Sequence, residues 1–174
     1  FTIDPGLTLH FYDNKNTQLG QTFAKDISDI RPNLRVNMQF KKNENLRFTY
    51  RKNTQFTDVN NISEGYVFNN YNSIFRGNRG LEAAIVNSYN LNYRSINQFT
   101  FTNVYSNISY SKRENSIQSR AAIDGINSVR TADNSIFPRE TYSARARLDR
   151  RFKNIKINLS ANFRYSEFSN IINN

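Results

Sequence analysis

The feature that most constrains the fold of this chain is an alternation of apolar and polar residues with a period of two. Between residues 34 and 40, apolar side chains alternate with arginine, asparagine and glutamine, and residues 46–51 repeat the pattern. Successive side chains of a β-strand point to opposite faces, so such a stretch predicts a strand with one apolar and one polar face. The pattern returns at 89–94, 142–149 and 155–165, which predicts an all-β chain with antiparallel hairpins.

Turn signals between these stretches divide the chain into about seven predicted strands. They are 2–12, 33–41, 46–53, 87–94, 98–123, 127–149 and 154–166. The last strand has the length that a tilted strand needs to cross a bilayer, about 9–11 residues. Phe99 and Phe101 are out of phase with the apolar residues that follow, so a β-bulge is expected near Asn103. The one candidate for a helix is a single turn in residues 80–86.

The connections between the predicted strands alternate between short and long. The short ones are 42–45, 95–98 and 150–153, and the long ones are 13–32 and 54–86. Asp124-Gly125 is a hairpin-turn signal, so 98–123 and 127–149 should form one tall hairpin that turns at 124–126. Short turns on one rim and long loops on the other are typical of outer-membrane barrels, whose short turns face the periplasm. The two kinds of connection are therefore expected on opposite rims.

The composition argues against a packed globular core. Only 37% of the residues are hydrophobic and the mean hydropathy is −0.73, yet 14% are aromatic, whereas disordered chains are poor in aromatic residues. A barrel that meets lipid on one face and water on the other hides few residues completely and fits this composition. The chain has no cysteine for a disulfide framework and no run of about 18 apolar residues for a transmembrane helix.

The polar phase of the alternation indicates which face meets water. It carries Arg35, Arg47, Arg51, Arg94, Arg145, Arg147 and Arg164. An arginine on the lipid face costs about 2–4 kcal/mol near the bilayer midplane, and several together would exceed the ~5–15 kcal/mol stability of a domain. This phase should therefore face a wet lumen. A soluble β-sandwich would show the same alternation but would bury its apolar face under a second sheet. The residues that distinguish the two folds are Leu46, Phe48, Ile157 and Leu159.

Four segments between residues 32 and 110 carry a resemblance to a known family. They are Pro32-Asn-Leu-Arg-Val-Asn-Met-Gln-Phe, Asn45-Leu-Arg-Phe-Thr-Tyr-Arg-Lys-Asn-Thr, Phe75-Arg-Gly-Asn-Arg-Gly-Leu-Glu and Ser88-Tyr-Asn-Leu-Asn-Tyr-Arg. In this order they resemble Bacteroidetes-type outer-membrane β-barrel proteins, which are similar to TonB-dependent receptors. Residues 77–81 take the place of the family's Gly-Asn-Pro-x-Leu-type segment, with arginine instead of proline. The proline that usually follows the Tyr-Arg stretch is also missing.

The resemblance implies a fragment of a transmembrane β-barrel, about seven strands of a barrel of about 22 that holds a plug. Residues 1–174 would all belong to one outer-membrane β-barrel domain, as an internal piece without the plug domain. The implied function is the wall of a TonB-dependent-type transporter that imports a large nutrient or chelate across the bacterial outer membrane. Implied partners are outer-membrane lipid, a TonB-type energising complex acting through parts outside this stretch, and a surface lipoprotein or envelope-complex protein.

Two other functions stay open. The chain could be a structural or interaction barrel subunit of an envelope complex, or a soluble ligand-binding β-sandwich. An N-terminal plug domain in the full protein would favour the transporter.

No arrangement of residues indicates an enzyme, a metal site or a cofactor. His10 is the only histidine, which argues against a catalytic triad or a histidine-pair metal site, and an interfacial or lumenal side chain is expected. Asp26 and Asp29 could contribute to a calcium site, although solvated loop acids are the default. Gly77 and Gly80 lack the Lys-Ser/Thr of a phosphate loop. The net charge of +10 suits an anionic partner, but the arginines alternate away from the aromatics, so no nucleic-acid binding is expected.

The long loop 54–86 is the best candidate for ligand binding. Long loops on a rigid scaffold commonly carry ligand contacts, and tyrosine, asparagine and arginine suit sugar-like or peptide ligands. The candidate residues are Tyr66, Phe68, Tyr71, Phe75, Arg76 and Arg79. The alternative is a surface loop that packs on its neighbours.

Aromatic residues near the predicted strand ends should form girdles at the membrane interfaces. These residues include Tyr50, Tyr93, Phe99, Tyr142 and Tyr165. Ordinary cross-strand packing is the alternative explanation.

Overall fold

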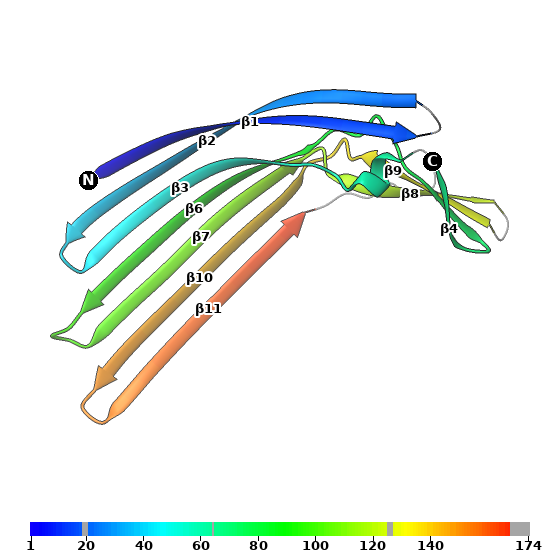
Figure 1. Ribbon diagram of the computed structural model, residues 1–174. Helices are drawn as coiled ribbons and strands as arrows, with labels where there is room; N and C mark the ends of the chain where they lie inside the picture. Colours follow the sequence, from blue (N-terminus) through cyan, green and yellow to red (C-terminus); the bar gives the residue numbers. More distant parts are fainter. Residues whose placement is uncertain (19–20, 64, 125–126, 168–174) are drawn as a thin grey trace.

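A computed structural model describes residues 1–18, 21–63, 65–124 and 127–167, and within them nearly all the structure is β. Seven strands form one curved antiparallel sheet, here called the wall, in the order β1-β2-β3-β6-β7-β10-β11 (Figure 1). Their bounds are β1 Thr2–Gln18, β2 Gln21–Lys41, β3 Glu44–Gln55, β6 Ala84–Asn97, β7 Thr102–Glu114, β10 Arg139–Phe152 and β11 Ile155–Glu167. The predicted all-β, antiparallel sheet of about seven strands is confirmed.

The wall is an open sheet whose edge strands are β1 and β11. Among the described residues these two strands do not pair with each other, which agrees with the expectation that the chain does not close a small barrel on itself. Each neighbouring pair of wall strands is antiparallel, and the turns that join β2 to β3, β6 to β7 and β10 to β11 are short.

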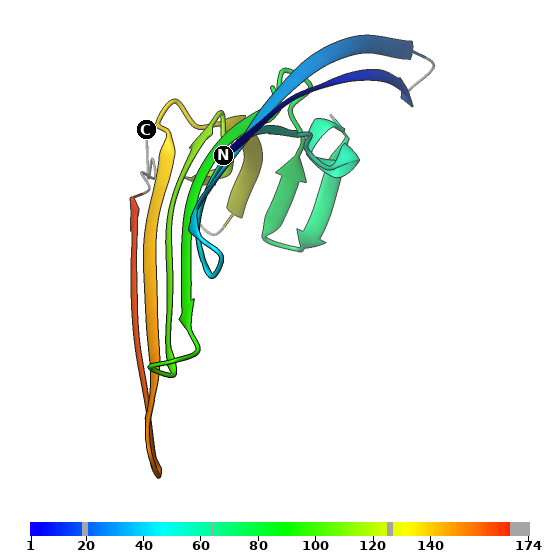
Figure 2. The ribbon, with the colours of Figure 1, turned by 90° about the vertical axis from the view of Figure 1, so that its left-hand side faces the viewer.

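Four further strands form a second sheet, here called the cap sheet, in the order β4-β5-β9-β8. Their bounds are β4 Tyr66–Asn70, β5 Ser73–Arg76, β8 Ile117–Asp124 and β9 Asn127–Asn134, and a one-turn helix, α1 Val59–Ile62, precedes them. Each outer pair is an antiparallel hairpin, but β5 and β9 join the hairpins through a parallel pairing. Figure 2, which views the wall nearly edge-on, shows the cap sheet to one side of it.

The short and long connections lie on opposite rims of the wall, as predicted (Figure 1). The turn between β6 and β7 occupies residues 98–101 and not 95–98, because the ladder continues as far as Asn97 and Thr102. Phe99 and Phe101 therefore belong to the turn, and the bulge expected near Asn103 is wrong. The register of β6 with β7 runs unbroken, and the wall's register shift lies instead between Gln39 and Lys41.

The predicted connection 13–32 is in fact mostly strand. Residues 13–18 and 21–32 continue the β1–β2 hairpin far past the predicted loop boundary. Residues 13–18 are all polar, and the apolar residues of 21–32 do not keep a period of two, yet the two backbones still pair. The predicted tall hairpin 98–123 and 127–149 is wrong in the opposite sense, because it is divided into wall and cap strands. Asn115 adopts a φ of 53° after β7, and Pro138, which has no N–H for a ladder, precedes β10.

Two smaller expectations concern residues 80–86 and the turn at Gly125. Residues 80–86 form no helix, and β6 begins within them at Ala84. The turn predicted at Gly125 lies outside the described residues, although the pairing of Asp124 with Asn127 brackets it. Among the described residues, no helix combines the length and the apolar character needed to cross a membrane. The buried hydrophobic side chains are Leu81, Ala84 and Ala132, so the small core lies where the cap sheet meets the wall.

Candidate functional site

The predicted arginines do share one face of the wall. Arg47 on β3 is paired with Asn37 on β2 and with Asn92 on β6, and the pairing continues through Asn107 on β7 to Arg145 on β10. Directly paired residues of neighbouring strands point to the same side of a sheet. The face defined in this way, here called the arginine face, carries Arg35, Arg47, Arg94, Arg145, Arg147 and Arg164. The acids that alternate onto it are Asp4, Asp29 and Asp149.

Neutral amides hold two of these arginines in place. The Arg47 Nε donates to Asn37 Oδ1 at 2.7 Å, and the Arg145 Nε donates to Asn162 Oδ1 at 2.8 Å. Arg147 instead pairs with Asp149 at 2.9 Å. An open cavity of about 700 Å³ lies among them, lined mainly by arginine, asparagine and Tyr105. The amides leave the positive charge of Arg47 and Arg145 uncompensated, so the face is suited to water and to anionic ligands.

The opposite face of the wall is apolar and uncovered. Ile157 and Leu159 are 39% and 58% exposed, and Leu46 and Phe48 are half-buried, so none of the four is buried by protein. Leu91 on β6, in the middle of the wall, is 36% exposed, so the exposure is not confined to the edge strands. The soluble β-sandwich would bury this face under a second sheet and is therefore wrong. A lipid bilayer is the environment that suits such a face.

Five tyrosines cross the apolar face in a row on adjacent strands. They are Tyr50, Tyr89, Tyr110, Tyr142 and Tyr165, and each is the direct strand partner of the next. The ring centroids of successive pairs are 4.9, 5.8, 4.7 and 6.3 Å apart, within the usual range for contacts between aromatic rings. We call this set the tyrosine row.

The tyrosine row marks the boundary of the apolar face on the rim that carries the long connections. Two residues further toward that rim, the same phase of the strands carries Lys52, Lys112 and Glu140. From Tyr165 to Ile155 the apolar phase runs for about 34 Å along β11, at roughly 3.4 Å per residue. With a strand tilt of about 45°, this corresponds to roughly 25 Å of membrane, the height of a barrel's apolar band.

The prediction of an aromatic girdle was only partly right. Tyr50, Tyr142 and Tyr165 belong to the tyrosine row, but Tyr93 lies inside the apolar band and Phe99 lies in a turn on the opposite rim. Sequence reasoning missed Tyr89 and Tyr110. The period of two places Tyr89 and Tyr110 on the apolar face of their own strands. Their alignment in a row depends on the register between strands, which this period does not specify.

The cap sheet brings together only some of the predicted ligand-binding residues. Tyr66 is paired with Arg76, whose guanidinium lies 5.6 Å from the centroid of the tyrosine ring, and Phe68 follows on the same face. The other three lie elsewhere: Tyr71 is 91% exposed at the tip of the β4–β5 hairpin, Phe75 is on the other face of β5, and Arg79 is half-buried in the segment that follows β5.

No pattern in the sequence indicates that β8 and β9 belong to this sheet. Parallel pairing with β5 sets Val129 beside Ile74 and Thr131 beside Arg76, so β9 extends the face that carries Tyr66 and Phe68. Arg120 on β8 is paired with Thr131 and lies on the same face. The turn signal at Asp124-Gly125 predicted a hairpin but not its partner in the sheet.

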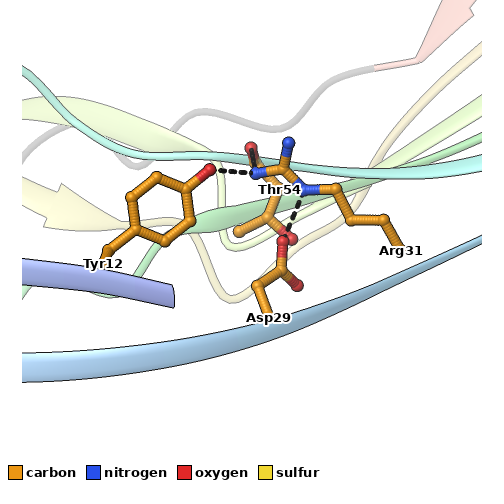
Figure 3. A network of polar contacts seen from close by, with 4 residues as sticks. All are labelled: Tyr12, Asp29, Arg31 and Thr54. Atoms are coloured by element: carbon orange, nitrogen blue, oxygen red, sulfur yellow. Dashed lines mark hydrogen bonds and ion pairs between the residues drawn. The ribbon is translucent and has the colours of Figure 1, made fainter. Parts of the chain in front are cut away.

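A polar network ties the extended β1–β2 hairpin to β3 beyond the tyrosine row (Figure 3). The Arg31 Nε donates to Asp29 Oδ2 at 2.6 Å, and its Nη2 donates to the Tyr12 hydroxyl at 2.7 Å and to the Thr54 carbonyl at 3.1 Å. We call these four residues the clasp. Burial by itself raises the pKa of Asp29, but the hydrogen bond and positive charge of Arg31 outweigh it and leave that pKa below its usual value. The clasp therefore holds Asp29 ionised.

One of the two acids considered for a calcium site, Asp29, belongs to the clasp. Asp29 is committed to Arg31, and the side chain of Asp26 lies outside the described part of the structure. Among the described residues, no group of histidine, cysteine, aspartate and glutamate could hold a metal ion. His10 is half-buried on the arginine face, with its ring 5.8 Å from that of Tyr12.

Comparison with known proteins agrees with this geometry. The sequence model of the outer membrane protein beta-barrel family matches residues 7–174. Among solved structures, the chain is similar to a double mutant of the Serratia marcescens hemophore receptor HasR, determined in complex with its hemophore HasA and heme. The TM-score is 0.62 at 12% identity, over 94% of this chain and 30% of the receptor chain. At that identity the likeness shows the fold alone. No curated protein matches the sequence.

Proposed function

Because the chain belongs to the outer membrane protein beta-barrel family, we propose that it forms part of the wall of a TonB-dependent-type transporter that imports a large nutrient or chelate. The family puts the chain in the bacterial outer membrane as part of a barrel wall, and the likeness of its fold to the HasR receptor supports a receptor. Import is the step proposed here. It is supported by a wall with one face for lipid and one for water, and by a folded sheet on its extracellular rim.

The cap sheet is the proposed place of ligand contact. Tyr66 and Phe68 are 62% and 72% exposed and lie on one face with Arg76. Exposed aromatic rings next to a guanidinium suit the stacking and hydrogen bonding that sugar-like, chelate or peptide ligands require. Tyr71 at the tip would extend this contact surface, and Phe75 and Arg79 would contribute from the other face of β5 and from the segment that follows it. Their role in ligand binding is proposed from their position in the loop 54–86.

The proposed transporter needs partners that act through parts of the protein beyond these 174 residues. The chain spans 30% of the length of the HasR receptor to which it is similar. A plug domain, and a segment on which a TonB-type energising complex acts, would belong to the rest of the full-length protein. A surface lipoprotein would be a further partner on the extracellular rim.

A second candidate function is an interaction barrel within an envelope complex. The observation that favours it is the exposed apolar surface of the cap sheet, where Val67 and Ile123 are 50% and 68% exposed. Such surfaces often mark protein contacts. This function requires the same wall but no imported ligand.

Growth of the native bacterium separates the two functions. The full-length gene is deleted and restored as wild type or as a Tyr66→Ala, Phe68→Ala, Arg76→Ala triple variant. Growth is then measured on single sources of heme, ferric chelates or oligosaccharides. For import, the wild type restores growth on one source, and the triple variant needs about tenfold more of it because ligand contacts are lost.

The matched control is Phe40→Ala, an aromatic residue that is 60% exposed on the opposite rim, and it should behave like the wild type. An uncoupler of the proton gradient should stop accumulation of the nutrient but leave its binding to cells. If the restored gene is needed for envelope integrity but not for growth on any of these nutrients, the result would contradict import and support the interaction barrel.

A further inference from the structure

At the extracellular end of the arginine face, arginines from three adjacent strands surround a row of hydroxyls. The residues are Arg113 and Ser111 on β7, Arg139 and Thr141 on β10, and Arg164 and Ser166 on β11. Ser111 is paired with Thr141, and Thr141 with Ser166, so the three hydroxyls cross the sheet in one line. The pair Arg113–Arg139 lies on one side of this line, and Arg164 lies on the other. The six residues line an open cavity of about 330 Å³.

The strand register creates an electrostatic conflict in this cavity. Arg139 is the direct partner of Arg113, and the Cβ atoms of directly paired residues are about 4.5–5.5 Å apart. Like charges in that position destabilise a sheet unless something of opposite charge lies between them. A bound anion would turn this repulsion into two attractions.

The acids that are nearest in sequence alternate onto the other face of the wall. Glu114 pairs with Lys112 at 2.6 Å, and Glu140 accepts a hydrogen bond from the Tyr142 hydroxyl at 2.7 Å. Glu167 is the direct partner of Glu140 and so belongs to the same face. Among the described residues, Arg113 and Arg164 form no ion pair, and no acid lines the cavity. The charges of Arg113 and Arg164 are therefore not neutralised by an acid on this face of the described sheet.

The rest of the arginine face differs in this respect. Arg47 and Arg145 have their Nε atoms bound to asparagine oxygens, and Arg147 is paired with Asp149. Those contacts fix the guanidinium groups against the sheet. Hydroxyls, which can turn to donate or accept, replace the asparagines in the smaller cavity. Of these, Thr141 and Ser166 lie within hydrogen-bond distance of each other at 3.3 Å.

We propose that Arg113, Arg139 and Arg164 bind a tetrahedral oxyanion, a phosphate or sulfate group, over the hydroxyl row. A guanidinium presents a planar fork of donors that matches two oxygens of such a group. Three forks on two sides of the row can engage oxygens that a carboxylate, with two oxygens, does not have. The hydroxyls of Ser111, Thr141 and Ser166 donate to the side of the anion that faces the sheet. The site requires only that the arginine face meets water, so it does not depend on import.

The test uses the full-length protein in lipid nanodiscs, with inorganic phosphate and glucose 6-phosphate as probes and their ³¹P resonances as the readout. Saturable binding is expected for the wild type, with sulfate in competition. Arg113→Gln and Arg164→Gln should each weaken binding about tenfold, because each loses a charge-assisted contact. The matched control is Arg35→Gln, since Arg35 lies on the same cross-strand line of the arginine face as Arg164 but five strands away. It should bind within about twofold of the wild type.

Each outcome of this test counts for or against the site. Equal loss of binding in Arg35→Gln and Arg164→Gln would show that phosphate follows the general charge of the face, and would overturn the proposal. Absence of saturable binding in the wild type would overturn it as well. Tighter binding of glucose 6-phosphate than of phosphate would identify the ligand as a phosphate ester and not the free ion. If Arg113→Gln fails to assemble, Arg113→Lys keeps the charge without the fork and should still weaken binding.

Discussion

The wall and the cap sheet are built from the same kinds of residue but are held together in different ways. In the wall, neighbouring strands are joined by a turn or by one long connection through the cap, and every pairing is antiparallel. In the cap sheet, two hairpins from distant parts of the chain meet through the parallel pair β5 and β9. A lipid-facing wall is thus specified strand by strand, whereas the cap sheet requires that its two distant hairpins first be brought together.

The two regions also leave apolar side chains exposed for different reasons. Leu91 in the wall is 36% exposed and Val129 in the cap sheet is 39% exposed, so protein covers them almost equally. The difference lies in the solvent on the exposed side, which is lipid for Leu91 and water for Val129. This pair makes the comparison testable.

The largest effect is expected when arginine replaces these two residues. Leu91→Arg puts a charge on the lipid face and should reduce the free energy of unfolding by about 2–4 kcal/mol. Val129→Arg keeps its charge in water and should change it by less than about 0.5 kcal/mol. The measurement is urea unfolding of the full-length protein in lipid vesicles. Equal effects of the two substitutions would mean that Leu91 does not face lipid.

The tyrosine row should contribute to the wall as a connected unit. Tyr110 contacts Tyr89 on one side and Tyr142 on the other. Each aromatic pair adds about 0.5–1.5 kcal/mol, so Tyr110→Ala should lower the free energy of unfolding by about 1–3 kcal/mol. Tyr110→Phe keeps the ring and should cost much less. The cap residue Tyr71, which is 91% exposed, supplies the control, and an effect of Tyr71→Ala as large as that of Tyr110→Ala would contradict the row's role.

Replacing Gly77 should destabilise the cap sheet and leave the wall unchanged. A Cβ at this position would lie 2.2 Å from the Ser63 carbonyl oxygen and 2.7 Å from that of Asn61, both backbone atoms. Gly77→Ala should therefore separate the two segments and loosen the cap sheet by about 2 kcal/mol. The readout is faster cleavage of the cap by a protease added to intact cells, with urea stability of the wall unchanged.

Gly80→Ala is the matched control for this experiment. Its Cβ would meet only the Asn78 side-chain oxygen at 3.2 Å, which can move. Protease resistance should stay close to that of the wild type. A loss of wall stability in Gly77→Ala would show that the two regions unfold together and not separately.

The smallest effect is expected at the clasp. Asp29→Asn keeps an acceptor for Arg31 but removes its charge, which should cost about 1 kcal/mol of local stability. Since the pKa of Asp29 is lowered in the fold, its contribution is present above the unfolded value of about 3.9 and is lost as the pH falls through the lower folded value. Hydrogen exchange of the β1–β2 extension should thus rise in acid for the wild type. In Asp29→Asn that rise should be absent, and an unchanged pH dependence would contradict the role of the clasp.

The wall was predictable from the sequence because the alternation within each strand indicates which of its faces meets lipid and which meets water. Leu46 and Arg47 lie on opposite faces as the period of two requires, and a lipid face does not tolerate arginine. Physical reasoning failed where the pattern carries no such information. Residues 13–18 are polar throughout and still pair, and Phe99 and Phe101 belong to a turn although they alternate like a strand.

The candidate site was predictable only in part for the same reason. Tyr66, Phe68 and Arg76 could be chosen because a long aromatic loop is conspicuous in the sequence. The pairing of Ile74 with Val129 could not, because no local pattern specifies which distant hairpin completes a sheet. The facing of Arg113 and Arg139 likewise becomes visible only with the register of β7 and β10.

The parallel junction of β5 and β9 also has a consequence for the order in which the molecule forms. Ile74 and Val129 are about 55 residues apart in the chain, and contacts of such separation form slowly because a long loop must first be closed. Wall hairpins such as β6–β7 close over a turn of only a few residues. We expect the hairpins of the wall to form early and the parallel pairing of β5 with β9 to form late. The extracellular rim would then be the last part of the chain to gain protection during assembly and the first to lose it.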